Sequence, residues 1–146
     1  RQATATLIGN NTFTFNTTDN LELVRQNTVT ITDNIITDGG TGINDAFTDC
    51  VCTLSYNNVW NNTSDYVNET AGTGSISIDP EFTNTGSDDY HVDPTNGTID
   101  AGSANASTFT LSDGSTLADR PTREDNVKDA DTLNGDGLKV NMGYHY

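Results

Sequence analysis

The residues best suited to acid–base chemistry lie together in one short segment. Asp88, Asp89 and His91 place two carboxyl groups beside an imidazole, and glycosidases use such carboxyl pairs, one to protonate the leaving oxygen and one to activate water. Adjacent residues of an extended chain point to opposite faces, so Asp88 and Asp89 share a cleft only where the chain bends. We therefore assign no catalytic residue from the sequence.

An eliminating lyase would instead need a lysine or arginine base close to an acidic sugar. The chain has 6 basic residues, and the sequence makes no acidic partner evident for any of them. The sequence therefore indicates no lyase base.

One acidic segment near the C-terminus offers oxygen ligands, which suit a hard cation such as Ca²⁺. The segment departs from the EF-hand pattern because Leu133 stands where that loop needs an oxygen ligand. It is thus either a calcium site or a solvated acidic turn. The candidate ligands are Asp129, Asp131, Asn134 and Asp136.

The two cysteines, Cys50 and Cys52, are separated by one residue, so on a strand both side chains point to the same face. A bridge between them would be strained, and a lone Cys-x-Cys offers too few ligands for a metal. The sequence leaves two states open, a pair of buried thiols and a disulfide.

Asn-x-Ser/Thr sequons are dense in this chain and favour an extracellular or cell-surface address, with glycosylation as a candidate modification. Richness in Asn and Thr alone also generates such sequons by chance. Two aromatic residues, Tyr56 and Trp60, could stack on a sugar face or simply pack at a sheet edge. The sequons begin at Asn10, Asn16, Asn61, Asn62, Asn68, Asn96 and Asn105.

Charge excludes one class of partner. With 21 acidic and 6 basic residues the net charge is -15, so the chain repels a phosphate backbone and lacks the counterion release that drives nucleic-acid binding. No apolar run is long enough to suggest a membrane span. Because the chain starts at Arg1 without a Met or a signal segment, we expect a processed or excised protein.

Three strand-like segments, residues 6–13, 29–36 and 52–59, recur at a spacing of 23. A fourth, residues 75–78, follows after 24. Apolar residues alternate with Thr or Ser, which predicts strands and no helices. Aligning the segments produces three columns: Ile8, Ile31 and Leu54; Asn11, Asn34 and Asn57; Phe13, Ile36 and Val59.

A repeat of this length is too short for a βαβ unit and fits one coil of a parallel β-helix, in which alternate side chains stack in a shared narrow core. The Asn column falls where the strand should turn, so we expect these amides to bond neighbouring coils and to tolerate left-handed backbone. An antiparallel sandwich is the competing fold, but it does not predict columns at constant spacing.

The tail carries an ordered set of short motifs: residues 78–82 (IDPEF), 88–92 (DDYHV), 99–102 (IDAG) and 141–146 (NMGYHY). In this order they resemble the C-terminal ends of bacterial and archaeal right-handed parallel β-helix repeat proteins of the pectate-lyase-like superfamily. The tail departs from them at Asn141, where they usually have Asp, and at Gly97-Thr98, where they tend to have Ser-Pro-Ala. The resemblance implies a secreted or surface protein whose C-terminal segment folds back over the last coil.

We therefore predict an all-β fold, a right-handed parallel β-helix of three to four coils over residues 1–82, with an irregular C-terminal capping segment over residues 83–146. The first functional hypothesis is a non-catalytic extracellular module, structural, adhesive or self-assembling through its open end. The alternative is the C-terminal part of a polysaccharide-degrading enzyme, a lyase or glycoside hydrolase, whose cleft lies mostly in upstream coils. Carbohydrate is a candidate partner in both.

Overall fold

The computed structural model describes residues 6–24, 28–93, 95–105, 108, 114–115 and 139–143. Within them the secondary structure is short strands and one turn of 3₁₀ helix, η1 (Thr85–Ser87). The strands are β1 (Thr6–Gly9), β2 (Thr12–Thr14), β3 (Asp19–Leu23), β4 (Thr28–Thr32), β5 (Ile35–Thr37), β6 (Thr41–Asp45), β7 (Val51–Ser55), β8 (Asn58–Trp60) and β9 (Ser64–Val67).

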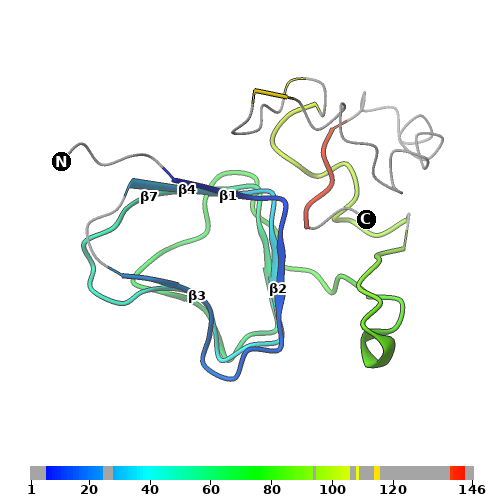
Figure 1. The fold of residues 1–146 in the computed structure, drawn as a ribbon, viewed down its shortest axis with the longest axis horizontal. Helices are drawn as coiled ribbons and strands as arrows, with labels where there is room; N and C mark the ends of the chain where they lie inside the picture. The colour runs from blue at the N-terminus through cyan, green and yellow to red at the C-terminus, as the bar shows by residue number, and fades with distance from the viewer. Residues whose placement is uncertain are drawn as a thin grey trace.

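These strands form three parallel sheets, ordered β1-β4-β7, β2-β5-β8 and β3-β6-β9 (Figure 1). Three consecutive strands, one from each sheet, make one rung, so the molecule has a first rung (β1 to β3), a second (β4 to β6) and a third (β7 to β9). Every pairing between these strands is parallel, which rules out an antiparallel sandwich for this part of the chain. The all-β prediction is confirmed, and the arrangement is β-helix-like.

The predicted columns are confirmed by the strand register. Ile8 pairs with Ile31 and Ile31 with Leu54, while Phe13 pairs with Ile36 and Ile36 with Val59. Side chains from all three sheets meet in one core, because strand residues alternate between the inside and the outside. Its buried members are Leu23, Val29, Ile31, Ile36, Ile43 and Val59.

The spacing is not constant on the third sheet. Leu21 pairs with Ile43, 22 residues on, whereas Ile43 pairs with Tyr66, 23 residues on. The first rung is therefore one residue longer than the second between its second and third strands, and the stretch from β3 to β4 is one residue shorter than the stretch from β6 to β7. Val24 and Phe47, apolar residues that follow β3 and β6, are 46% and 60% exposed and lie outside the core.

The Asn column bonds successive rungs at the corner between the first two sheets. Asn34 is fully buried; its Nδ2 donates to the carbonyl oxygens of Ile8 (3.0 Å) and Thr32 (2.9 Å) and to Asn57 Oδ1 (2.9 Å). Its Oδ1 accepts from the backbone N (3.0 Å) and Nδ2 (3.3 Å) of Asn11. One amide side chain thus joins all three rungs.

Left-handed backbone was predicted at the Asn column, but it occurs at the residue that precedes each Asn of that column. Asn10, Asp33 and Tyr56 have φ of 54°, 60° and 51°, so the residue before each ladder Asn makes the bend. This frees the ladder Asn to point inward and bond along the axis, while the bend itself needs a residue that tolerates positive φ.

A second amide ladder, which the sequence did not reveal, occupies the next corner. Asn62 Nδ2 donates to the carbonyls of Ile36 and Trp60, both at 3.2 Å, a pattern that matches Asn57 one corner earlier. The equivalent position of the second rung is Gly39, whose Cβ would lie 2.4 Å from Asn20 Nδ2.

Asn20 supplies the amide that Gly39 lacks. Its Nδ2 donates to Thr37 O (2.9 Å) and to Asn62 Oδ1 (2.8 Å), which correspond to two of the acceptors that Asn34 uses at the first corner. Position 39 must therefore be glycine, because the Asn20 amide fills the space that a side chain would need. Since the position carries no Asn, aligning the repeats does not reveal this second ladder.

The fourth segment does not form a rung with the expected spacing. Residues 72–78 make only isolated parallel bridges, Ser55 to Thr73 and Asn58 to Ile76, an offset of 18 where the sequence suggested 24. The chain takes a shorter path here, so the structure has three rungs of strands. Asn58 holds this segment through both polar atoms of its amide, with Ile78 N donating to Oδ1 and Nδ2 donating to Ile78 O.

The described part of the tail lies along the outer face of the β2-β5-β8 sheet, beside β2 (Figure 1). Asp33 Oδ1 and Oδ2 accept from Ser103 N (2.6 Å) and Oγ (2.7 Å), and Gly143 N donates to Asp33 O (2.8 Å). Outward-facing Ile35 is only 1% exposed, and Gly143 lies directly against it. The described part of the tail thus packs against the side of the coils.

We predict that Asn34→Ala lowers the free energy of unfolding by about 2–4 kcal/mol, because it strands several buried polar partners at once. Asn11→Ala, which removes the ladder amide of the first rung, should cost only about 1 kcal/mol. Urea unfolding of the two variants checks this. Equal losses would contradict the role given to Asn34.

Candidate functional site

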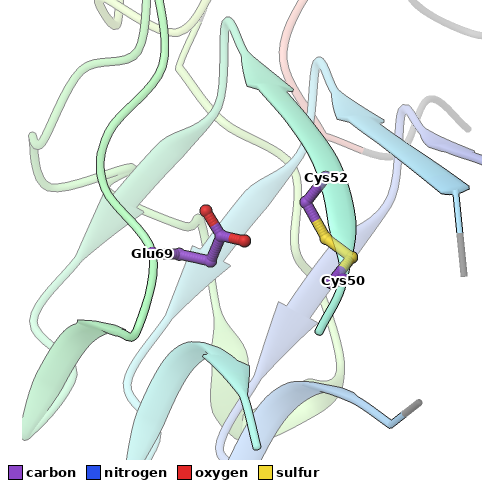
Figure 2. A group of neighbouring side chains, drawn as sticks. All are labelled: Cys50, Cys52 and Glu69. Carbon is purple, nitrogen blue, oxygen red and sulfur yellow. A yellow bond between two sulfur atoms is a disulfide. The ribbon is translucent and has the colours of Figure 1, made fainter. Parts of the chain in front are cut away.

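The structure gathers one group of metal-ligating side chains that sequence reasoning missed. Cys50, Cys52 and Glu69 each place a ligand atom within 4.8 Å of the others. Figure 2 shows the Glu69 carboxylate pointing toward the two sulfurs. Cys50 immediately precedes β7, Cys52 lies in it and Glu69 follows β9. About one turn of the coil therefore separates Glu69 from the cysteines in sequence, and the corner between the third and first sheets brings them together.

The two cysteines are joined as a disulfide, one of the two states that the sequence left open. Their Cα atoms are 5.3 Å apart, and both side chains pack against the apolar core. They face the same way because they are alternate residues of an extended segment. Neither cysteine is free.

A second carboxylate lies behind this group. Asp45 is 2% exposed, and its Oδ2 accepts from Cys50 N at 3.3 Å. Its Oδ1 is buried without a hydrogen-bond partner among the described residues. Burial raises the pKa of Glu69, and the negative charge of Asp45 raises it further.

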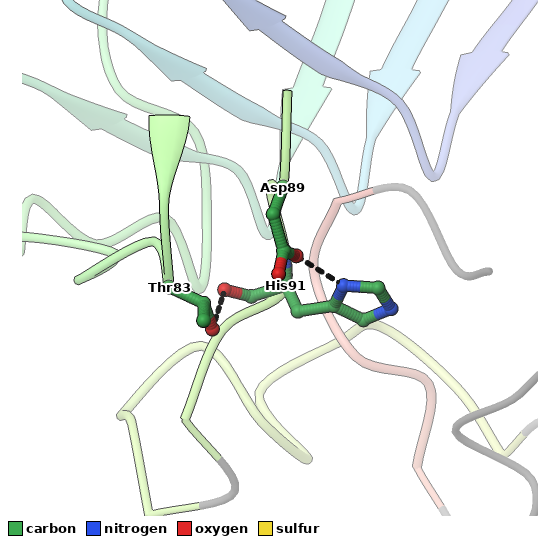
Figure 3. A network of polar contacts seen from close by, with 3 residues as sticks. All are labelled: Thr83, Asp89 and His91. Carbon is green, nitrogen blue, oxygen red and sulfur yellow. Dashed lines mark hydrogen bonds and ion pairs between the residues drawn. The ribbon is translucent and has the colours of Figure 1, made fainter. Parts of the chain in front are cut away.

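The segment with two carboxyls and an imidazole forms a local turn. His91 Nδ1 contacts the Asp89 carboxylate (Figure 3), and Asp89 Oδ1 also accepts from His91 N at 3.2 Å. Thr83 Oγ1 donates to His91 O at 3.0 Å. Asp88 has a φ of 55°, so the chain does bend between the two acids.

The predicted sequon residues occupy different environments. Asn16, Asn61, Asn68 and Asn105 are exposed, Asn10 and Asn62 are half-buried, and Asn96 is buried. Asn62 is committed to the second amide ladder, and Asn96 Nδ2 donates to Asp79 O at 3.0 Å. Three of the exposed amides also donate hydrogen bonds: Asn16 Nδ2 to Asn20 Oδ1, Asn68 Nδ2 to Asp45 O and Asn61 Nδ2 to Asp38 Oδ1. Of these bonds only that of Asn61 is exposed to solvent.

The remaining candidates differ in how far the structure describes them. Asp129, Asp131, Asn134 and Asp136 lie outside the described residues, so the calcium site stays a prediction. Tyr56 is half-buried, and a Cβ on Gly74 would lie 2.4 Å from its ring. Trp60 is also half-buried, at the end of β8.

Residues 2–114 match the family described as disaggregatase related. The chain belongs to this family. The disaggregatase-related family is archaeal and surface-associated, which agrees with the address expected from the sequons. No curated protein and no solved structure matches the chain. In the part that the structure describes, no helix has the length and apolar character to cross a bilayer.

We predict opposite effects for two adjacent sequon substitutions in a host that N-glycosylates this protein. Asn61→Gln should remove one glycan from the intact mass and change the melting temperature little, because this side chain is exposed and so is its one hydrogen bond, to Asp38. Asn62→Gln should leave the mass of the attached glycans unchanged and cost about 1–3 kcal/mol of stability, because the longer amide breaks the second ladder. Glycan loss in the Asn62 variant would contradict the assignment.

Proposed function

We propose that the chain is a non-catalytic, right-handed parallel β-helix module of the cell surface that self-associates through its exposed first rung. The observation that carries this proposal is the state of that rung. Ile31, Ile36 and Ile43 of the second rung are completely buried, while their first-rung partners Ile8, Phe13 and Leu21 are only partly buried. The apolar core side chains of the first rung are thus partly exposed at this end of the coil.

The amide ladder is open at the same end. Asn34 Oδ1 and Asn57 Oδ1 each accept two hydrogen bonds from the rung before, whereas Asn11 Oδ1 has no such donor among the described residues. Strand β1 also has β4 as its single described neighbour. Open strand edges with apolar side chains beside them favour pairing with another chain.

The opposite end favours a closed pair over a filament. Residues 72–78 already bond to the third rung, with Tyr56 N donating to Thr73 O at 2.9 Å and Val59 N to Ile76 O at 3.1 Å. Head-to-tail stacking would have to displace this segment. Two first rungs can meet across a twofold axis, which produces a dimer and stops.

Charge opposes association, so salt should promote it. The net charge of -15 makes two copies repel each other at low ionic strength. Because this repulsion is screened over about 10 Å at 0.1 M salt and about 3 Å at 1 M, the apolar contact between rungs is expected to dominate in concentrated salt.

We predict that the full chain shifts from monomer to dimer as its concentration and the salt concentration rise, measured by sedimentation velocity. Ile8→Lys should keep it monomeric, because the lysine stem can reach out of the open end and place a charge on the joining surface. Thr53→Lys, on an exposed position of β7, is the matched control and should dimerise normally. A strictly monomeric wild type at high concentration in 1 M salt would overturn the proposal.

A second candidate, the terminal part of a polysaccharide-degrading enzyme, is supported by the contact between Asp89 and His91, a pairing that can orient an imidazole base. It predicts that the full-length protein releases unsaturated or shortened products from acidic glycans, followed by ultraviolet absorbance and reducing-end assay. His91→Ala should abolish the release. Absence of product from the wild-type protein would reject this candidate.

A further inference from the structure

The corner that holds Cys50, Cys52 and Glu69 has the composition of a site for a thiophilic cation. Two sulfurs and one carboxylate oxygen already lie within 4.8 Å of one another, so a single ion could reach all three with small side-chain movements. Zn²⁺ takes cysteine thiolate at about 2.3 Å and carboxylate oxygen at about 2.0–2.2 Å, most often in tetrahedral geometry. Three protein ligands leave one position for water.

Asp45 is the independent observation that points to a ligand. Its side chain is 2% exposed, yet Oδ1 has no hydrogen-bond partner among the described residues. A buried carboxylate oxygen without a donor is costly. Since Asp45 Oδ2 accepts from Cys50 N at 3.3 Å, this carboxylate borders the group, and a metal-bound water could donate to its unpartnered oxygen.

The local charge also favours a cation. Glu69 and Asp45 repel each other, and neither has an ion-pair partner in the described part of the chain. The described residues contain one lysine or arginine, Lys139, and it lies in the tail opposite Asn105. A divalent ion would therefore neutralise charge that no basic side chain among the described residues offsets.

The geometry points to a redox-gated metal site: when the Cys50–Cys52 disulfide is reduced, both thiolates and the Glu69 carboxylate bind a thiophilic divalent cation of the Zn²⁺ class, with Asp45 holding its water. In the reduction, a dithiol reductant gives two electrons and two protons to the disulfide and becomes a disulfide itself. The ion then displaces the two thiol protons as it forms two metal–sulfur bonds. The oxidised protein keeps the sulfurs bonded to each other and cannot bind.

The test titrates the full chain with Zn²⁺, and in parallel with Co²⁺, before and after reduction by a dithiol and its anaerobic removal. Reduced protein should take up one equivalent, with the ultraviolet charge-transfer band of a Co²⁺–thiolate complex. Oxidised protein should show no such band. Cys52→Ser should abolish the band.

Variants of the acids separate this site from adventitious thiol chelation. Glu69→Gln should weaken binding at least about tenfold, the lower bound seen even for outer-shell partners, and Asp45→Asn should weaken it on the order of 10-fold. Glu22→Gln, an exposed acid on β3, is the matched control and should bind as the wild type does.

Three results would overturn the inference: no uptake by the reduced wild type above the oxidised level, equal affinity in the Glu69→Gln variant, or equal loss in the Glu22→Gln variant. Circular dichroism follows the strands through the same titration. Should reduction unfold the chain, the proposal requires that Zn²⁺ restores the strand signal and that Glu69→Gln prevents this recovery.

Discussion

Hydrogen bonding along the axis by buried amide side chains is the constraint on which this fold depends. A rung of three short strands buries too little apolar surface to be stable alone, so each rung must stack on another. Asn34 and Asn57 set the vertical order at one corner, and Asn20 with Asn62 does so at the next. Because these amides are buried or half-buried and are shared between rungs, a slip in register would leave several polar groups without partners.

The repeat made much of the architecture predictable. Period-two alternation and a constant spacing identify the strands of the first two sheets, and stacking of like on like then requires parallel pairing of Ile31 with Ile8 and Leu54. The repeat could not reveal a position where a residue from elsewhere in the sequence supplies the ladder amide. Gly39 breaks the second ladder in any alignment, and only three-dimensional proximity shows that the Asn20 amide fills its place.

The contacts at the ends of the coil and at the candidate site do not recur from repeat to repeat, so the sequence spacing does not predict them. The path of residues 72–78 depends on what bonds to the Asn58 amide, and the tail's position depends on the outward face of Ile35 and the carboxylate of Asp33. Each of these contacts occurs once and is not repeated in the neighbouring rungs. Glu69 likewise meets Cys50 and Cys52 only because the chain folds into a corner there. In the sequence alone, the Cys-x-Cys motif therefore has too few ligands for a metal. Membership of the disaggregatase-related family agrees with the cell-surface address, and the open first rung suggests how such a module joins another.

The most direct test of the central claim is a set of nuclear Overhauser contacts between methyl groups of protein labelled at Ile and Leu. Stacked rungs predict that the Ile31 methyls contact both Ile8 and Leu54, whereas Ile8 and Leu54 do not contact each other. Contacts that join Ile8 directly to Leu54, or an Ile31 side chain with neither neighbour, would contradict the account.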